Sequence, residues 1–226
     1  MMNHRTLLRG GALVRGGVHA VALAAAVASL GTLMSACAPL VVSGAMVGGT
    51  LVAIDRRTSG AQVEDEAIEL KGVLRVREVA GSGAHVNLTS YNRMVLITGE
   101  VPAPEDVKKI EQAVARLENV RSVVNELAVA PASSLTQRSS DTVTTGRIKA
   151  AFIDTKDLQA NAIKVVTERG IVYLMGRVTP RESKLAAEVV RGVPGVQKVV
   201  RVFESISEDE LAAMRQDPSS DKGVKK

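Results

Sequence analysis

Few residues in this sequence have side chains that could carry out covalent or metal chemistry. The chain has one cysteine, Cys37, and of its three histidines only His85 lies beyond the N-terminal apolar segment. A single cysteine allows no intrachain disulfide and no zinc cluster built from cysteines. His85 has no second histidine to join it, so we expect it at a strand edge or on the surface. The sequence therefore predicts no catalytic centre, no metal site and no cofactor.

The acidic residues that stand close together have structural explanations. Asp154 and Asp157 have the spacing of part of a calcium loop, but the later glycine and glutamate of such a loop are missing. Glu105-Asp106 and Glu208–Glu210 stand where helices are expected to begin, and acids at that position interact favourably with the helix dipole. We therefore expect a protein that is not an enzyme.

Cys37 stands where a lipid could be attached. Residues 1–36 begin with a basic segment, continue with an apolar run and end in small residues before Cys37, in the sequence Leu-Met-Ser-Ala-Cys. This order is typical of a bacterial export signal, and its end resembles a lipobox. The apolar run is shorter than the ~20 residues that a membrane-spanning helix needs. The sequence predicts a signal peptide over 1–36 and lipidation of Cys37, with an ordinary buried cysteine as the alternative.

The segment after Cys37 is a second apolar stretch. Residues 37–60 contain glycines with the spacing that lets helices approach closely in lipid. Because each glycine weakens a helix, we favour a flexible tether over a packed helix. Several acyl chains on Cys37, at ~0.8 kcal/mol for each buried CH₂, would anchor the chain stably. Loss of the three arginines of the signal leaves 26 basic and 24 acidic residues, a net charge of +2.

The elements that must position any functional residue occur twice. Val95–Val101 matches Val172–Val178, and Val120–Leu127 matches Val196–Phe203, at separations of 77 and 76 residues. A period of this length indicates a duplicated small domain rather than a solenoid. Each copy predicts the order αββαβ, with two helices on one face of a three-stranded sheet and an α+β fold class.

The predicted elements of the two copies follow from hydrophobic periodicity and turn residues. In the second copy, Thr179 as N-cap, Pro180 and Glu182 form a strong helix start with a capping box. The elements of the first copy are helix Asp65–Arg77, strands His85–Ser90 and Met94–Val101, helix Pro104–Leu117 and strand Val120–Val129. Those of the second are helix Asp141–Thr155, strands Ala162–Thr167 and Ile171–Val178, a helix from Thr179 that stops at Gly192–Gly195, and strand Val196–Ile206.

These elements divide the chain after the signal and tether into two domains. We expect the first domain over 61–130, a linker rich in Ser, Ala and Thr over 131–140, and the second domain over 141–206. A short helix and a disordered tail are expected over 207–226.

The paired strand Val-x-Leu-x-Gly-x-Val, the amphipathic helix after it and the closing valine-rich strand resemble the BON domain. Two such domains behind a lipidated cysteine resemble the DolP family of outer-membrane lipoproteins. The resemblance covers Cys37–Ile206 and implies two tandem BON domains. The strings most similar to that family are Asp55–Thr58, Ile68–Lys71, Asn87–Tyr91 and Val165–Glu168.

The resemblance also implies a location and a role. Ala38, rather than an aspartate, follows Cys37, which by similarity to lipoprotein sorting implies the outer membrane, with the domains facing the periplasm. In the DolP family the second BON domain binds phospholipid through its first helix. The resemblance therefore implies support of envelope integrity and concentration at division sites.

The two copies differ in net charge, and the difference agrees with this role. Residues 61–130 hold 8 basic and 11 acidic side chains, whereas residues 138–206 hold 12 basic and 7 acidic ones. This asymmetry either serves solubility or directs the second domain to anionic lipid headgroups. The predicted lipid-binding residues on the first helix of the second domain are Arg147 and Lys149 as headgroup contacts, and Val143 and Ile153 as shallow apolar contacts.

Two further positions on the first helix of the second domain, Val143 and Phe152, bear on the expected mode of binding. The family's tryptophan near the start of this helix aligns with Val143, and the chain has no tryptophan, so we expect shallower insertion and a larger electrostatic share. Phe152 is one turn from Ile148, a spacing that favours the core.

The expected partner is an anionic phospholipid membrane. The alternative is a protein-interaction role, in which the acidic first domain serves as an adaptor for the outer-membrane barrel-assembly machinery. Nucleic acid is not expected as a partner, because aromatic residues make up only 2% of the chain and cannot form a base-stacking surface.

Overall fold

The computed structural model describes residues 55–216. The predicted signal peptide, Cys37 and residues 217–226 lie outside the described residues, as does the tether up to residue 54.

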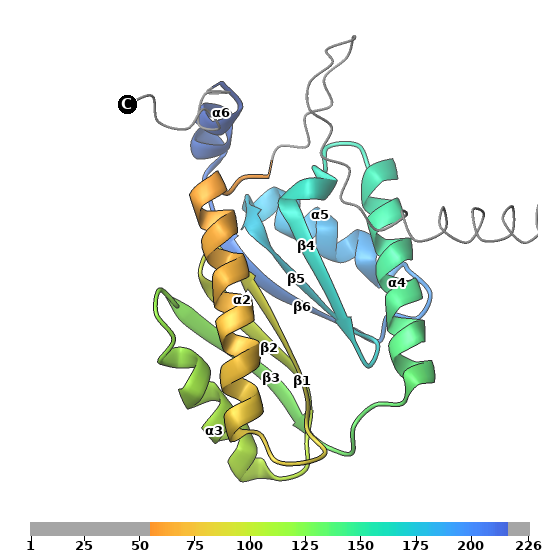
Figure 1. Cartoon of the computed structure of the whole chain (residues 1–226). Coiled ribbons are helices and arrows are strands. Elements are labelled where there is room, and N and C mark those ends of the chain that lie inside the picture. Colours follow the sequence, from red (N-terminus) through yellow and green to blue (C-terminus); the bar gives the residue numbers. More distant parts are fainter. Residues whose placement is uncertain (1–54, 217–226) are drawn as a thin grey trace, which may run out of the picture. The chain divides into compact units, whose positions relative to one another are not determined.

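Two copies of an αββαβ unit follow one another within the described residues, which confirms the predicted α+β fold (Figure 1). The first unit comprises α2 (Ser59–Val79), β1 (His85–Tyr91), β2 (Met94–Val101), α3 (Pro104–Ala115) and β3 (Ser122–Val129). The second comprises α4 (Leu135–Asp154), the short helix η2 (Ala160–Ala162), β4 (Ile163–Glu168), β5 (Ile171–Val178), α5 (Pro180–Arg191) and β6 (Lys198–Ser205), and α6 (Glu208–Gln216) follows it.

Each unit has a sheet whose middle strand pairs with both neighbours. β1 and β2 form an antiparallel hairpin, and α3 then carries the chain back so that β3 lies parallel to β2. The second sheet repeats this topology with β4, β5 and β6. The parallel pairing requires a crossover helix, which is the role of α3 and α5.

An aspartate of the first helix holds the hairpin turn in each unit. Asp65 on α2 accepts hydrogen bonds from the backbone N–H groups of Asn92 and Arg93, at 2.7 Å each. Asp141 on α4 accepts from those of Arg169 and Gly170, at 2.8 and 2.9 Å. Both turns contain residues at positive φ, which is typical of tight hairpin turns.

The glycine of the repeated strand motif is required by close backbone packing. A Cβ at Gly99 would overlap the carbonyl oxygen of His85, and one at Gly176 would overlap that of Ala162. Gly99 also has a φ of +117°, which favours glycine. The duplicated glycine therefore lets the first strand of each hairpin lie directly against the second.

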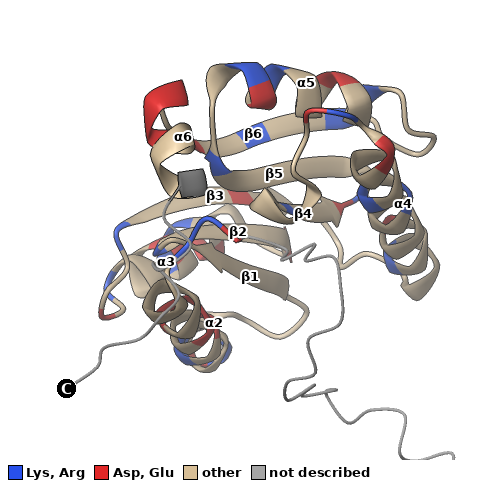
Figure 2. Cartoon of the chain, turned by 90° about the horizontal axis from the view of Figure 1, so that it is seen from above, with Lys and Arg blue, Asp and Glu red and all other residues tan. Residues whose placement is uncertain are grey.

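The helices cover one face of each sheet, and the other faces pack on each other. In β2, Val95, Ile97 and Val101 are buried with α2 and α3, whereas Leu96 belongs to a separate core. That core joins the sheets and contains Tyr91, Leu96, Tyr173, Met175 and Val202. Figure 2 shows the two sheets between α5 on one side and α2 on the other. Both faces of each sheet are therefore covered.

Two helices begin earlier than the sequence predicts. α2 begins at Ser59, where the Thr58 side chain accepts a hydrogen bond from the Ala61 N–H, so the helix starts inside the predicted tether. α4 begins at Leu135, inside the segment 131–140 that was predicted to be a linker. Its N-cap is Ser134, whose hydroxyl accepts from the Gln137 N–H. A Ser/Thr-rich segment has low helix propensity, and the cap together with docking onto the sheet overrides it.

Candidate functional site

Helix α4 carries all four predicted lipid-binding residues. Its inner side is fixed by Ile148 and Phe152, which are buried in the core of the second unit. The predicted core position of Phe152 is therefore confirmed. The two buried residues hold the opposite side of the helix toward solvent, and that side contains the candidate site.

The outward side of α4 has an apolar centre with one basic residue on each flank. Val143 and Ile153 are 53% and 75% exposed, although both are large apolar side chains. At about 100° per residue, they lie about 80° apart on the helix, on the side opposite Ile148. Arg147 lies about 80° to one side of their midline, and Lys149 lies about 80° to the other. Both basic residues are exposed.

The surroundings of the two basic residues differ. The Arg147 guanidinium donates to the Pro194 carbonyl oxygen at 3.5 Å, in the loop before β6. Lys149 and Ile153 line a groove of about 380 Å³ that also includes Arg57, Tyr91 and Lys164. The site thus continues from the helix surface into a groove that both units line.

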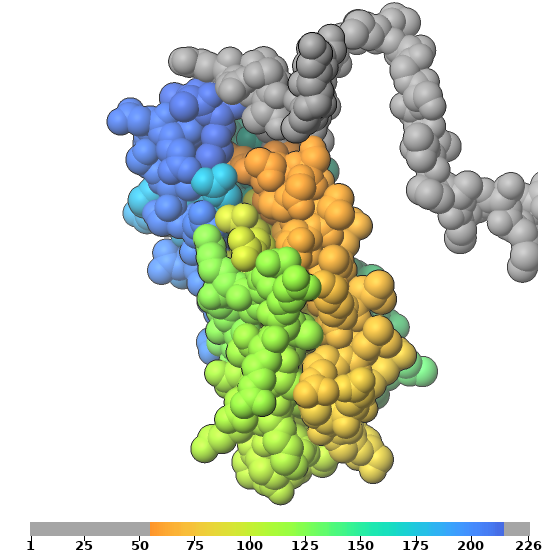
Figure 3. Space-filling model, turned by 60° about the vertical axis from the view of Figure 1, so that its left-hand side comes forward, coloured from red at the N-terminus to blue at the C-terminus, as the bar shows by residue number. Residues whose placement is uncertain are grey.

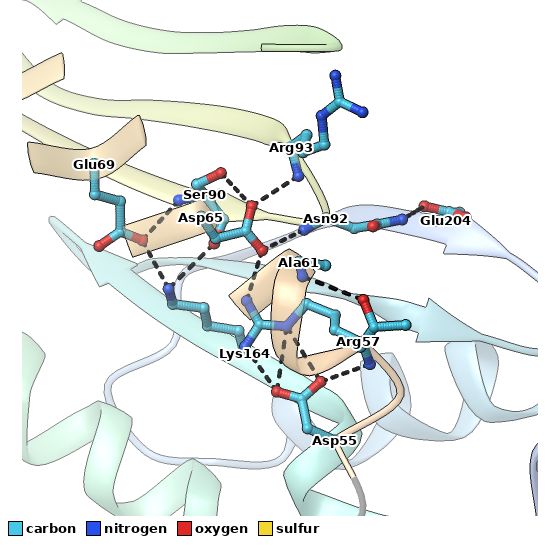
Figure 4. Close-up of polar contacts among 11 residues, drawn as sticks. Asp55, Arg57, Ala61, Asp65, Glu69, Ser90, Asn92, Arg93, Lys164 and Glu204 are labelled. Carbon is cyan, nitrogen blue, oxygen red and sulfur yellow. Dashed lines mark hydrogen bonds and ion pairs between the residues drawn. The ribbon is translucent and has the colours of Figure 1, made fainter. Parts of the chain in front are cut away.

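The floor of this groove is held by a network of charged side chains (Figure 4). The Arg57 guanidinium donates to Asp55 and to Asp65, at 2.7 Å each, and lies 4.5 Å from the centre of the Tyr91 ring. The Lys164 ammonium donates to Glu69 of α2 at 2.8 Å. Arg57 and Lys164 therefore both have acidic partners, and their first role is to hold the structure together.

The Asp65 carboxylate is the centre of the network. Burial by itself would raise the pKa of Asp65, but hydrogen bonds from the Ser90 hydroxyl, the Arg93 N–H and Arg57 outweigh it and hold the pKa below its ordinary value. Asp65 is therefore ionised at neutral pH and joins α2, the β1–β2 turn and the segment before α2.

The segment before α2 also reaches the second unit. Arg56 donates to both carboxylate oxygens of Glu182, at 2.7 and 2.8 Å, and both side chains are buried. Arg56 donates as well to the carbonyl oxygen of Arg177 at 2.8 Å. In the sequence, Asp55–Thr58 stands out only as a family-like string, and no local pattern indicates that Arg56 has a partner 126 positions away.

His85 belongs to a polar cluster between the units. It begins β1, at the edge of the first sheet, as predicted, and its side chain is half-buried. Its Nδ1 lies 3.0 Å from a carboxylate oxygen of Glu100 and 4.0 Å from one of Glu168. The ligand atoms of the three residues lie within 4.8 Å of one another, a spacing that a metal ion could bridge.

Protein groups surround the carboxylates of this cluster, although one buried oxygen, Glu100 Oε1, accepts no hydrogen bond. The Glu100 carboxylate accepts from the Ser133 N–H at 3.0 Å and has the Arg169 guanidinium at 3.5 Å. The Asn87 amide donates to Glu168 at 2.8 Å. Burial raises the pKa of Glu168, and the Asn87 hydrogen bond opposes this. We interpret the cluster as a charged contact between the units, because a cation and hydrogen-bond donors surround its carboxylates.

The remaining predicted features are placed as follows. Glu105 and Asp106 lie in the first turn of α3, and Glu208, Asp209 and Glu210 in that of α6, which confirms their positions at helix starts. The capping box of Thr179 and Glu182 is present in both directions. Cys37 lies outside the described residues. No helix among residues 55–216 combines the length and the apolar character needed to cross a membrane.

Comparison with known proteins gives one domain family for both units. The BON domain matches residues 65–131 and 140–205. The chain is 37% identical over 175 residues to the outer membrane lipoprotein DolP of Haemophilus influenzae, which covers 76% of this chain and 89% of that protein.

Two other relatives are more distant. The chain is 32% identical over 155 residues to a 21 kDa hemolysin of Actinobacillus pleuropneumoniae, over 68% of this chain and 80% of that protein. It is 27% identical over 117 residues to the osmotically inducible protein Y of Escherichia coli, over 50% of this chain and 58% of that protein.

Proposed function

The chain belongs to the BON-domain family as a DolP-like protein with two BON domains, and on this basis we propose that it is an outer-membrane lipoprotein that binds anionic phospholipid through α4 and supports envelope integrity. In this proposal Cys37 carries the lipid anchor, the domains face the periplasm, and the protein concentrates at division sites. The family also points to a non-catalytic role.

The observation that carries the proposal is the outward side of α4. Val143 and Ile153 form an exposed apolar strip, and Arg147 and Lys149 stand on its two flanks. A helix that lies in a membrane interface needs this arrangement, because apolar side chains enter the headgroup boundary while flanking cations contact the phosphates. No tryptophan is present, so contact is shallow and electrostatics supplies a large share of the affinity.

The charge of the second domain supports the same orientation. Its excess of basic residues over residues 138–206 favours an anionic leaflet, whereas the acidic excess over residues 61–130 opposes one. Each basic residue near an anionic surface contributes about 1 kcal/mol. A lipid anchor on Cys37 would hold α4 near the bilayer, so weak intrinsic affinity suffices.

The test is flotation of the chain from residue 38 onward with vesicles of anionic phospholipid. We expect binding that weakens as salt is raised, since exposed charges are screened. Reversal of both flanking charges, Arg147→Glu with Lys149→Glu, should lower vesicle affinity at least about 30-fold, from about 2 kcal/mol of lost attraction.

The matched control reverses Lys184→Glu and Lys198→Glu, which are exposed in the same domain but lie off α4. This variant has the same net charge as the first. It leaves the α4 face unchanged, so it should keep most of the binding. Equal loss in both variants would contradict a specific α4 face. A chain that does not float, yet gives a reproducible protein adduct when crosslinked from Glu105 or Glu111, would support the adaptor role instead.

A further inference from the structure

Helix α2 has a second apolar side that the fold does not cover. Its inner side is buried in the core of the first unit through Ile68, Gly72 and Val76. On the opposite side, Val63, Leu70 and Leu74 are 68%, 66% and 54% exposed. Figure 3 shows α2 along the molecular surface beside the α3 segment. A surface helix that is apolar on both sides normally has a partner on its outer side.

The spacing of the outward apolar residues is that of a helix–helix contact. Val63, Ala67, Leu70 and Leu74 follow one another at intervals of four, three and four residues. At about 100° per residue, they occupy an arc of about 60° centred on the outward side. Intervals of three and four are those of the seam between packed helices. The stripe therefore fits another helix laid along it.

The charges along α2 indicate which helix fits. Its first half, residues 59–69, contains four acidic residues and no basic one, whereas its second half contains Lys71, Arg75 and Arg77 with one acid, Glu78. A second α2 in antiparallel orientation would place each acidic half against the basic half of the other copy. An anionic leaflet would instead be repelled by the acidic half.

We propose that two copies of this chain associate through α2 in an antiparallel, two-fold symmetric contact. With the axis between Ile68 and Glu69, Val63 meets Leu74 of the second copy and Ala67 meets Leu70. Every apolar residue of the stripe then has an apolar partner, and the contact is isologous.

The same register pairs charges beside the stripe. Like flanks of two antiparallel helices face each other, so Lys71, which is exposed, lies beside Glu64 of the second copy, which is half-buried. Within one copy, Lys71 lies 3.2 Å from Glu118 in a pair with both side chains exposed. An exposed pair of this kind is weak, so Lys71 can exchange partners at little cost.

The test is sedimentation equilibrium of the full chain, extracted from membranes in density-matched detergent, over a range of protein concentrations. We expect a monomer–dimer equilibrium. Leu70→Asp should raise the dimer dissociation constant by at least about tenfold, because it places a charge in the centre of the apolar contact. Leu135→Asp is the matched control: Leu135 is 80% exposed on α4, and its substitution should leave the dissociation constant unchanged.

A charge exchange tests the register independently of the apolar stripe. Glu64→Lys alone and Lys71→Glu alone should each weaken the dimer, and the double variant should restore it, since the pair is re-formed with reversed signs. A monomer at every concentration, or a double variant no tighter than either single one, would overturn the proposal. Loss of vesicle flotation in Leu70→Asp without a change in sedimentation would also overturn it and assign the stripe to the bilayer.

Discussion

Arg56 and Glu182 form the most deeply buried ion pair among the described residues, with side chains 2% and 1% exposed. Arg56 precedes α2 of the first unit, and Glu182 belongs to the capping box of α5 in the second. The Glu182 carboxylate thus serves two structures, because it also accepts from the Thr179 N–H at 3.0 Å. A buried pair adds little net stability over apolar packing, but loss of one partner leaves the other charge unpaired.

We predict that Arg56→Met lowers the free energy of unfolding at neutral pH by about 3–5 kcal/mol, since Glu182 is left buried without its cation. Urea denaturation followed by far-ultraviolet circular dichroism measures this. Arg56→Met combined with Glu182→Gln should recover part of the loss, because the unpaired charge is removed. A double variant as unstable as the single one would mean that packing, not charge, is responsible.

The effect of Arg56→Met should depend on pH. Burial would raise the pKa of Glu182, but the hydrogen bonds from Arg56 and Thr179 hold it below the ordinary value. A lowered pKa in the folded state means that the pair stabilises above the ordinary glutamate pKa, and that this stabilisation is lost as pH falls through the lowered pKa. The difference in unfolding free energy between the wild type and the variant should therefore shrink in acid.

At the scale of elements, both units use one device to join their first helix to their hairpin. Asp65 and Asp141 accept hydrogen bonds from two successive backbone N–H groups of the turn. This contact orients α4 on its sheet and so directs the side that carries Val143 and Ile153 outward. The candidate membrane face depends on a carboxylate on the inner side of the same helix.

We predict that Asp141→Ala lowers the free energy of unfolding by about 1–3 kcal/mol, because the N–H groups of Arg169 and Gly170 lose their acceptor. Vesicle binding by the folded fraction should weaken as well, since α4 is held less firmly. The control is Asp154→Ala, an exposed acid at the end of the same helix, which should change neither quantity appreciably. Thermal unfolding and flotation measure the two effects.

The extent to which the sequence predicts these elements depends on where their determinants lie. The start of α5 follows from Thr179, Pro180 and Glu182, which are adjacent residues, and the structure has the predicted capping box. The start of α4 depends on Ser134 and on docking of the helix, so a Ser/Thr-rich segment was predicted to be a linker. The exposure of the four residues of the candidate face on one helix could be predicted from their spacing, whereas their binding of lipid stays a prediction. The groove beside them could not be predicted, because it joins residues from both units.

At the scale of the whole molecule, the two units share a core. Tyr91 and Leu96 of the first sheet pack with Tyr173, Met175 and Val202 of the second. The sequence contains a signal of this contact, since the middle strands are nearly continuous apolar runs and such runs indicate burial on both faces. It does not show which two faces meet. The two BON domains are therefore better described as one folded body than as two independent modules.

This shared core leads to a prediction about cooperativity. Leu96 and Met175 are fully buried between the sheets, so Leu96→Ala and Met175→Ala should each lower the free energy of unfolding by about 2–5 kcal/mol. Because the core belongs to both units, scanning calorimetry of the wild type should show one transition, and either substitution should lower its midpoint without splitting it. Val129→Ala, at a strand residue that is 52% exposed, serves as the control and should have little effect. Two transitions in the wild type, with each variant shifting only the one that belongs to its own unit, would show that the sheets do not unfold together.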